Sequence, residues 1–252
     1  MSDTILYRTD GPIARITLNY PQRHNSLGRE QLDALEAAVA RIEADRQVRV
    51  VVLTGEGEKT FCAGASLGEL SGGAIADEAF QRATARLAGL AVPTVCAMNG
   101  NVFGGGAELA ASCDFRIGIE GMRMRVPAAA LGLCYPVEGI RRFVECLGAQ
   151  ATRRILVGSE EFDALTLREI GFLDQVVPRA DLPQVTQALA EHIAGLAPLA
   201  VQSMKRILRQ MVWTGVDESQ AAELVRQCHE SSDLQEGFAA QREKRPAAFQ
   251  GC

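Results

Sequence analysis

A glutamate placed just after three glycines is the residue of this chain best suited to acid–base chemistry. Gly104, Gly105 and Gly106 precede Glu108 within residues 95–114, which read VCAMNGNVFGGGAELAASCD. The apolar residues before the glycines predict a strand, and the alanines and leucine after them predict a helix. Unpaired N–H groups at the start of such a helix can bind an anion or a developing oxyanion. The helix dipole favours the ionised glutamate, which can then accept a proton.

The same pattern also has a purely structural interpretation, in which the glycines allow close packing and the glutamate balances the helix dipole. Residues 55–70, GEGEKTFCAGASLGEL, predict a second strand followed by a glycine-rich loop. Two such units, one ending near Ala65 and the other near Gly105, could aim two backbone N–H groups at one point. That arrangement is the geometry of an oxyanion hole.

The elements that would position these loops follow from hydrophobic spacing. Residues 4–8 and 13–18 predict two strands joined by a tight turn, and the β-branched run at 48–53 predicts a strand buried on both faces. Further strands are expected at 115–119, 124–126 and 173–177, and helices at 32–42, 84–90, 185–193 and 199–212. The predicted architecture is a spiral α/β core over residues 1–195 and a helical part over 196–252.

Composition restricts the class of protein. With 252 residues, 47% of them hydrophobic, the chain can bury one large core. The net charge of −5 argues against nucleic acid as a partner, and no apolar run is long enough to predict a membrane helix. Seven cysteines without a CxxC pair favour reduced thiols and a cytoplasmic location. The three histidines lack ligand spacing, so no metal site is expected.

Four segments together resemble the enoyl-CoA hydratase/isomerase family, also called the crotonase superfamily. They are Pro21–Leu27, Phe61–Ser66, Asn99–Asp114 and Ser232–Phe249. The resemblance implies a spiral of ββα units, a C-terminal helical part that forms trimers, and assembly as a homotrimer or as a homohexamer built from two trimers. It also implies an acyl-CoA thioester as substrate, with no separate cofactor because coenzyme A is part of that substrate.

The resemblance also implies roles for individual residues. The thioester carbonyl would accept hydrogen bonds from the backbone N–H groups of Ala65 and Gly105, which stabilises an enolate, and Glu108 would be the principal base. The positions expected to bind coenzyme A are Gln22, Arg23, His24, Ala63, Leu67 and, across a subunit boundary, Lys244. Arg23 and Lys244 are equally compatible with ordinary surface charge.

The sequence departs from the family at the second catalytic glutamate. Hydratases carry that residue directly after a proline, and here Pro127 is followed by Ala128. Since alanine transfers no proton, efficient hydration is not predicted. Glu138 is the candidate second carboxylate, although a glutamate in a first helical turn more commonly stabilises its own helix. Tyr135 and Cys134 are alternatives that suit the pocket wall.

These residues favour an acyl-CoA lyase or isomerase of the enoyl-CoA hydratase/isomerase type. A double-bond isomerase or a decarboxylase would use the same enolate, and an acyl-CoA-binding protein without catalysis would keep the same fold. A more remote alternative is a serine hydrolase, because residues 64–68 also fit the GxSxG pattern.

Overall fold

The strands of this protein form one six-stranded and one four-stranded sheet in the computed structural model, which describes residues 4–66, 77–213 and 215–252. The larger sheet has the order β1 (Ile5–Asp10), β2 (Ile13–Leu18), β3 (Val50–Gly55), β5 (Thr94–Met98), β7 (Phe115–Ile119) and β10 (Gln175–Val177). The smaller sheet has the order β4 (Thr60–Cys62), β6 (Asn101–Phe103), β8 (Arg123–Arg125) and β9 (Glu161–Asp163). Strand pairs are parallel except for β1–β2 and β8–β9.

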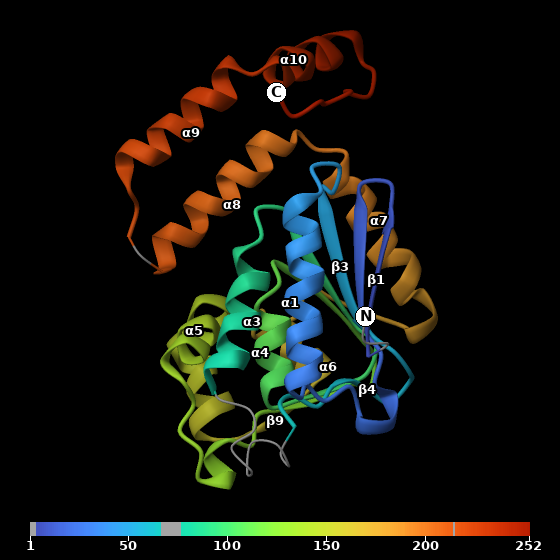
Figure 1. The fold of residues 1–252 in the computed structure, drawn as a ribbon, viewed down its shortest axis with the longest axis vertical. Helices are drawn as coiled ribbons and strands as arrows, with labels where there is room; N and C mark the ends of the chain where they lie inside the picture. Colours follow the sequence, from blue (N-terminus) through green and yellow to red (C-terminus); the bar gives the residue numbers. More distant parts are fainter. Residues whose placement is uncertain (1–3, 67–76, 214) are drawn as a thin grey trace.

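Successive ββα units build these two sheets. The helices that close the units are α1 (Arg29–Ala44), α3 (Asp77–Gly89), α4 (Gly105–Ala111) and α5 (Val137–Thr152). From the second unit onward, the first strand of each unit joins the larger sheet and the second joins the smaller one. The predicted α/β spiral is therefore confirmed (Figure 1).

The core lies between the larger sheet and its helices. Every residue of β5 is buried, as are all residues of β3 except Thr54, which agrees with the prediction of a strand covered on both faces. The predicted opening hairpin is also present, with Gly11 in its turn at a φ of 54°. The strands β6 and β9 were not predicted, because a three-residue strand is too short to show an alternating pattern.

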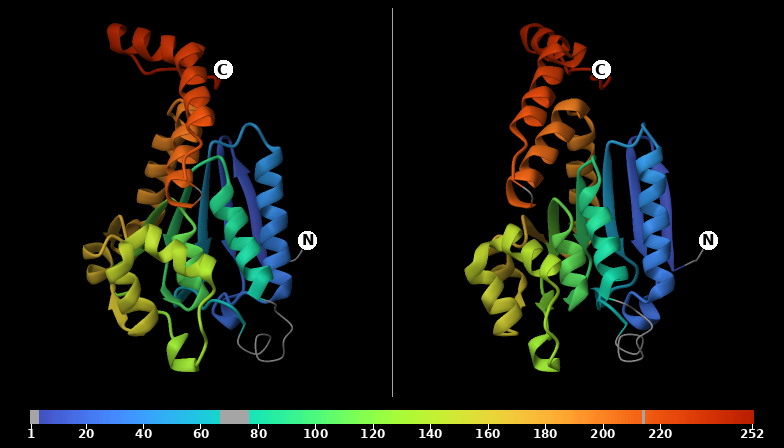
Figure 2. Two further views of the ribbon diagram at one scale, coloured as in Figure 1. Left: turned by 90° about the vertical axis from the view of Figure 1, so that its left-hand side faces the viewer. Right: turned by 60° about the vertical axis from the view of Figure 1, so that its left-hand side comes forward.

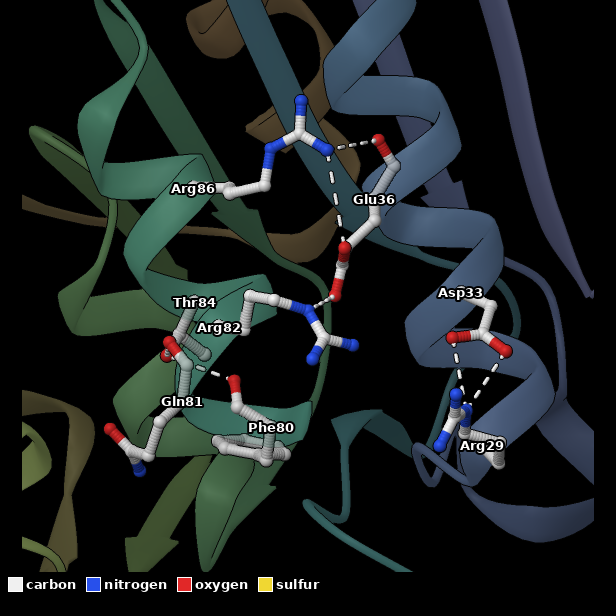
Figure 3. Close-up of polar contacts among 8 residues, drawn as sticks. All are labelled: Arg29, Asp33, Glu36, Phe80, Gln81, Arg82, Thr84 and Arg86. Atoms are coloured by element: carbon white, nitrogen blue, oxygen red, sulfur yellow. Dashed lines mark hydrogen bonds and ion pairs between the residues drawn. The ribbon is translucent and has the colours of Figure 1, made fainter. Parts of the chain in front are cut away.

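Helix α3 packs beside α1. One side of α3 faces α1, and another side faces the centre of the molecule. Figure 3 shows Arg82 and Arg86 reaching from α3 toward Glu36 on α1, and Arg82 Nε lies 2.8 Å from Glu36 Oε1. Gln81 leaves α3 on another side, away from α1. The ion pairs lie at the surface and contribute little free energy, but they mark the side of α3 that faces α1.

The rest of the chain is mostly helical. Its elements are the π-helix η3 (Arg153–Val157), α6 (Ala164–Glu169), the 3₁₀-helix η4 (Arg179–Asp181), α7 (Leu182–Ala194), α8 (Pro198–Trp213), α9 (Glu218–Glu230) and α10 (Ser232–Glu243). Helix α7 packs on the larger sheet. In all three views α9 and α10 extend beyond the core (Figures 1 and 2). No helix of the described chain combines the length and apolarity needed to cross a bilayer.

Helix α8 is anchored to the core through an aspartate of the glycine-rich motif. Lys205 Nζ on α8 lies 2.6 Å from Asp114 Oδ2 and donates to the Val92 carbonyl at 2.9 Å. The same Asp114 oxygen accepts hydrogen bonds from the backbone N–H and the hydroxyl of Thr94. Asp114 therefore has a structural role, since it joins the start of β5 to α8.

Candidate active site

Three loops meet at one edge of the smaller sheet. Strands β4, β6 and β8 are parallel neighbours, so their carboxyl ends lie at the same edge. The segments that follow them are residues 63–66, 104–106 and 126–136. The repeated ββα unit thus brings together the two predicted oxyanion loops and the stretch that contains Ala128 and Tyr135. Brought to one edge, these segments form the candidate site.

Two glycines allow the first two loops to touch. Gly64 has a φ of 84°, and a Cβ on it would lie 2.5 Å from the backbone nitrogen of Gly105. A Cβ on Gly106 would lie 2.4 Å from the carbonyl oxygen of Cys62. Real Cβ atoms do not approach backbone atoms this closely, so only glycine is compatible with the contact.

The loop after β4 is held by the segment at residues 24–27. Ala63 N donates to the His24 carbonyl at 3.0 Å, and Ser66 N donates to the Leu27 carbonyl at 3.0 Å. Between them, the Ala65 N–H has no acceptor anywhere in the described residues, and neither does the Gly105 N–H at the start of α4. The contact between the loops thus leaves two unpaired donors on adjoining segments, available to an oxygen atom of a ligand.

Glu108 lies one helical turn beyond Gly105 and is only 1% exposed. Its carboxylate is 3.3 Å from the Thr84 hydroxyl and 3.3 Å from Gln81 Nε2, both on α3. Burial raises the pKa of Glu108, although the charge of Arg142 and three hydrogen bonds from neighbouring side chains oppose the rise. A carboxylate whose pKa is raised in this way is a stronger base when it is ionised.

The side chain of Tyr135 also reaches the Glu108 carboxylate. A Cβ on Gly139, in the first turn of α5, would lie 2.5 Å from the Tyr135 ring and 2.9 Å from Glu108 Oε2, so both side chains pack against that glycine. Burial, followed by the charge of Glu108 and a hydrogen bond to it, raises the pKa of Tyr135 well above its usual value. Tyr135 is therefore a neutral hydrogen-bond donor at neutral pH. The Tyr135 ring contacts the Phe143 ring edge to face, with 5.9 Å between the ring centroids.

Arg142 was missed by the reasoning from sequence. Its Nε lies 3.7 Å from Glu108 Oε1, and both side chains are almost fully buried. Gly139, Arg142 and Phe143 form the inward face of α5, and this i, i+3, i+4 spacing was the available signal. Gln81 and Thr84 also went unpredicted, since polar residues on a helix are usually placed on its exposed face.

The predicted coenzyme A positions lie at the other end of the loop after β4. Gln22, Arg23 and His24 are exposed at the end of η1 (Pro21–Arg23), and the His24 ring lies 3.1 Å from the Thr60 hydroxyl. A cavity of about 510 Å³ is lined by His24, Ala63, Lys59, Phe103 and Arg179, among others. Leu67 lies outside the described residues. Lys244 is exposed at the end of α10, and α10 lies far from α4 in every view (Figure 2).

The structure separates the candidates for the missing glutamate. Ala128 is buried, with 6% of its surface exposed. Glu138 and Cys134 are exposed, whereas Tyr135 reaches Glu108. Of the three candidates, the structure brings only Tyr135 to the buried carboxylate.

The serine-hydrolase alternative would require a histidine that follows Ser66 in the sequence and lies near it in space, and the histidines after Ser66 are His192 and His229. His192 is in the last turn of α7, which packs on the larger sheet, and His229 is in the last turn of α9. Helix α9 lies away from the loop edge in all views (Figures 1 and 2). This arrangement gives the hydrolase interpretation no support.

Comparison with known proteins is consistent over the whole chain. The family profile described as enoyl-CoA hydratase/isomerase matches residues 8–252. The short-chain-enoyl-CoA hydratase of Clostridium acetobutylicum is 28% identical over 96% of each chain. YngF of Bacillus subtilis, a candidate enoyl-CoA hydratase/isomerase, is 33% identical over 100% of each chain. The crystal structure of an enoyl-CoA hydratase from Bacillus anthracis superimposes with a TM-score of 0.91 at 29% identity, covering 99% of this chain and 100% of that one.

Proposed function

The chain belongs to the enoyl-CoA hydratase/isomerase family, and from that premise we propose that it stabilises the enolate of an acyl-CoA thioester at the edge where residues 63–66 and 104–106 meet. The thioester oxygen accepts hydrogen bonds from the N–H groups of Ala65 and Gly105. The observation that carries this proposal is the pair of unpaired donors on two touching loops. Such donors, fixed before the reaction, stabilise the charge that develops on the oxygen.

In this proposal Glu108 is the base that moves the proton. It removes a proton from a carbon next to the thioester or from the vinylogous position, and the electron pair passes to the thioester oxygen as an enolate or dienolate. The same carboxylic acid then returns the proton to the other carbon, which shifts the double bond. One carboxyl group suffices for these two proton transfers, because it is ionised again when the second transfer is complete.

Hydration places a heavier demand on the site. Water must be oriented and deprotonated while the α-carbon gains a proton, and two carboxyl groups share these tasks naturally. Among the described residues, the groups at Glu108 are Thr84, Gln81, Tyr135 and Arg142, and none is a carboxylate. We therefore propose that double-bond isomerisation is faster than hydration in this enzyme.

Coenzyme A binding is proposed at the cavity next to Ala63. His24 lines this cavity, Gln22 and Arg23 are the exposed residues just before it, and Leu67 follows the Ala63 loop in sequence. Because α10 lies far from α4 (Figure 2), the proposed role of Lys244, at the end of α10, is in the site of a neighbouring subunit of a trimer or hexamer. The proposed location is the cytoplasm.

We expect the purified protein to isomerise 3-butenoyl-CoA to crotonyl-CoA faster than it hydrates crotonyl-CoA. The conjugated enoyl thioester absorbs near-ultraviolet light, so its appearance and its loss report the two reactions separately. If hydration is the faster reaction, the proposed preference for isomerisation is wrong, but the proposed enolate intermediate is unaffected. Binding of both thioesters without either reaction, and without exchange of the α-proton in D₂O, would indicate an acyl-CoA-binding protein.

Tyr135→Phe should move the acid limb of the pH profile of kcat/KM to higher pH. The hydrogen bond from Tyr135 lowers the pKa of Glu108, and Glu108 accepts a proton only when it is ionised. Losing that bond raises the pKa, so activity on the acid side should fall about tenfold, as expected for one hydrogen bond to a charged group. Tyr7→Phe, on β1, is the matched control. An unshifted limb in Tyr135→Phe would exclude this role.

A further inference from the structure

One edge of a buried guanidinium beside the proposed base has no hydrogen-bond acceptor among the described residues, although the charge of Glu108 lies close to it. The Arg142 side chain is 3% exposed, and its Nε and Nη2 have no hydrogen-bond acceptor among the described residues. The Glu108 oxygen, 3.7 Å from Nε, is too distant for a hydrogen bond. Arginine remains charged in proteins, so two buried donors without acceptors are costly.

The rest of the guanidinium is fixed in place. Its carbon lies 5.1 Å from the centre of the Trp213 ring, at the end of α8, and Arg141 lies 5.3 Å from the same ring. Trp213 Nε1 donates to Glu145, which anchors the indole to α5. The guanidinium of Arg142 thus lies over the ring, and the edge formed by Nε and Nη2 is the part that has no hydrogen bonds.

That edge has the geometry of a carboxylate site. Nε–H and one Nη2–H of a guanidinium point in parallel, and they match the two oxygens of a carboxylate in a bidentate pair. On the other side of Glu108, Gln81 Oε1 is also buried and without a donor. Polar atoms without hydrogen-bond partners on both sides of Glu108 suit an acyl group that carries a polar group as well as a hydrocarbon chain.

We propose that the preferred acyl group carries a second carboxylate at its far end, and that Arg142 binds it. The proposal rests on the proposed function, since it names the substrate class of that same site. The bound carboxylate is retained in the reaction, because an ion pair with Arg142 stabilises it against loss as carbon dioxide.

The test uses saturated thioesters, so that binding is measured without turnover. Succinyl-, glutaryl- and adipyl-CoA are compared by calorimetry with butanoyl-, pentanoyl- and hexanoyl-CoA, which have a methyl group in place of the carboxylate. The wild-type protein should bind at least one dicarboxylic thioester about tenfold more tightly than its methyl counterpart, as expected for a buried charge-assisted pair.

Three variants assign the preference to one side chain. Arg142→Met should lose the preference for the dicarboxylic thioester, while its affinity for the methyl counterpart changes less than about threefold. Arg142→Lys keeps the charge without the planar fork and should retain only part of the preference. Arg141→Met is the matched control: Arg141 contacts the same Trp213 ring but is exposed, and its loss should leave the preference unchanged.

The outcomes separate this inference from the proposed function. If wild type binds the methyl thioesters and shows no preference for the dicarboxylic ones, the edge of Arg142 holds only water, and the inference fails while the proposed function stands. An equal loss of preference in Arg141→Met and Arg142→Met would also overturn it. If no thioester binds at all, both proposals fail together.

Discussion

Glu108→Gln should lower kcat for proton transfer by about 10²–10⁴-fold, the range typical of losing a general base. The amide keeps the size of the carboxyl group and can still contact Thr84 and Gln81, but it cannot accept a proton. The oxyanion donors belong to the backbone of Ala65 and Gly105 and are unaffected. Thioester affinity should therefore change by less than about fivefold, on the order of 1 kcal/mol.

The measurement is exchange of the α-proton of butanoyl-CoA in D₂O, which reports removal of the proton without requiring a double bond. Crotonyl-CoA affinity in the same variant shows whether the site is intact. Glu138→Gln is assayed in parallel, since Glu138 is the carboxylate predicted from sequence to assist. Retained exchange and hydration in that variant would remove Glu138 from the candidates for an assisting carboxylate. Exchange that continues at the wild-type rate in Glu108→Gln would refute its role as the base.

Gly64→Ala should damage both stability and activity. The substitution forces a Cβ to within 2.5 Å of the Gly105 nitrogen and 2.8 Å of the Phe103 carbonyl oxygen. Backbone strain at a φ of 84° and overpacking together should cost about 3 kcal/mol of unfolding free energy. Because the loops must move apart, kcat/KM should fall by about 10²–10³-fold, the cost of losing one oxyanion donor.

Gly171→Ala separates the two causes. Gly171 has a similar φ of 80°, but a Cβ on it would meet nothing within 4 Å. It should therefore lose only the strain component, about 1 kcal/mol, and keep full activity. Urea unfolding gives the free energies and the isomerase assay gives kcat/KM. If Gly64→Ala and Gly171→Ala lose the same unfolding free energy and the same kcat/KM, the contact between the loops does not determine the activity of the site.

The sequence predicted the larger elements well, because their hydrophobic spacing extends over several turns or residues. The buried strand at 48–53 and the amphipathic helices are examples. The three-residue strands β4, β6, β8 and β9 are different, since their existence depends on neighbours far away in sequence. Of these, β6 was missed between the apolar run and the glycines, and β9 was missed in a stretch that was expected to be mostly helical.

The candidate site was predictable only where a local pattern marks a residue. Glu108 follows a glycine run at the start of a helix, so its place near an anion site could be inferred from the sequence. Arg142 and Gln81 lie on helices from other units of the spiral, and they meet Glu108 only through packing. For Glu138 and Tyr135, the sequence offered no means of deciding which of the two faces inward.

The stacking of Trp213 on Arg142 connects the end of α8 to the pocket by thermodynamic linkage. Any ligand that binds better when the guanidinium is held against the indole must, by reciprocity, hold α8 more firmly against α5. The C-terminal helices then report on the pocket: with the acyl site filled, the backbone amides near the end of α8 exchange with solvent more slowly. Conversely, an event that pulls α8 away from the core, such as a change in the contacts of α9 and α10, reaches Glu108 as a change in its electrostatic surroundings without any movement of α4.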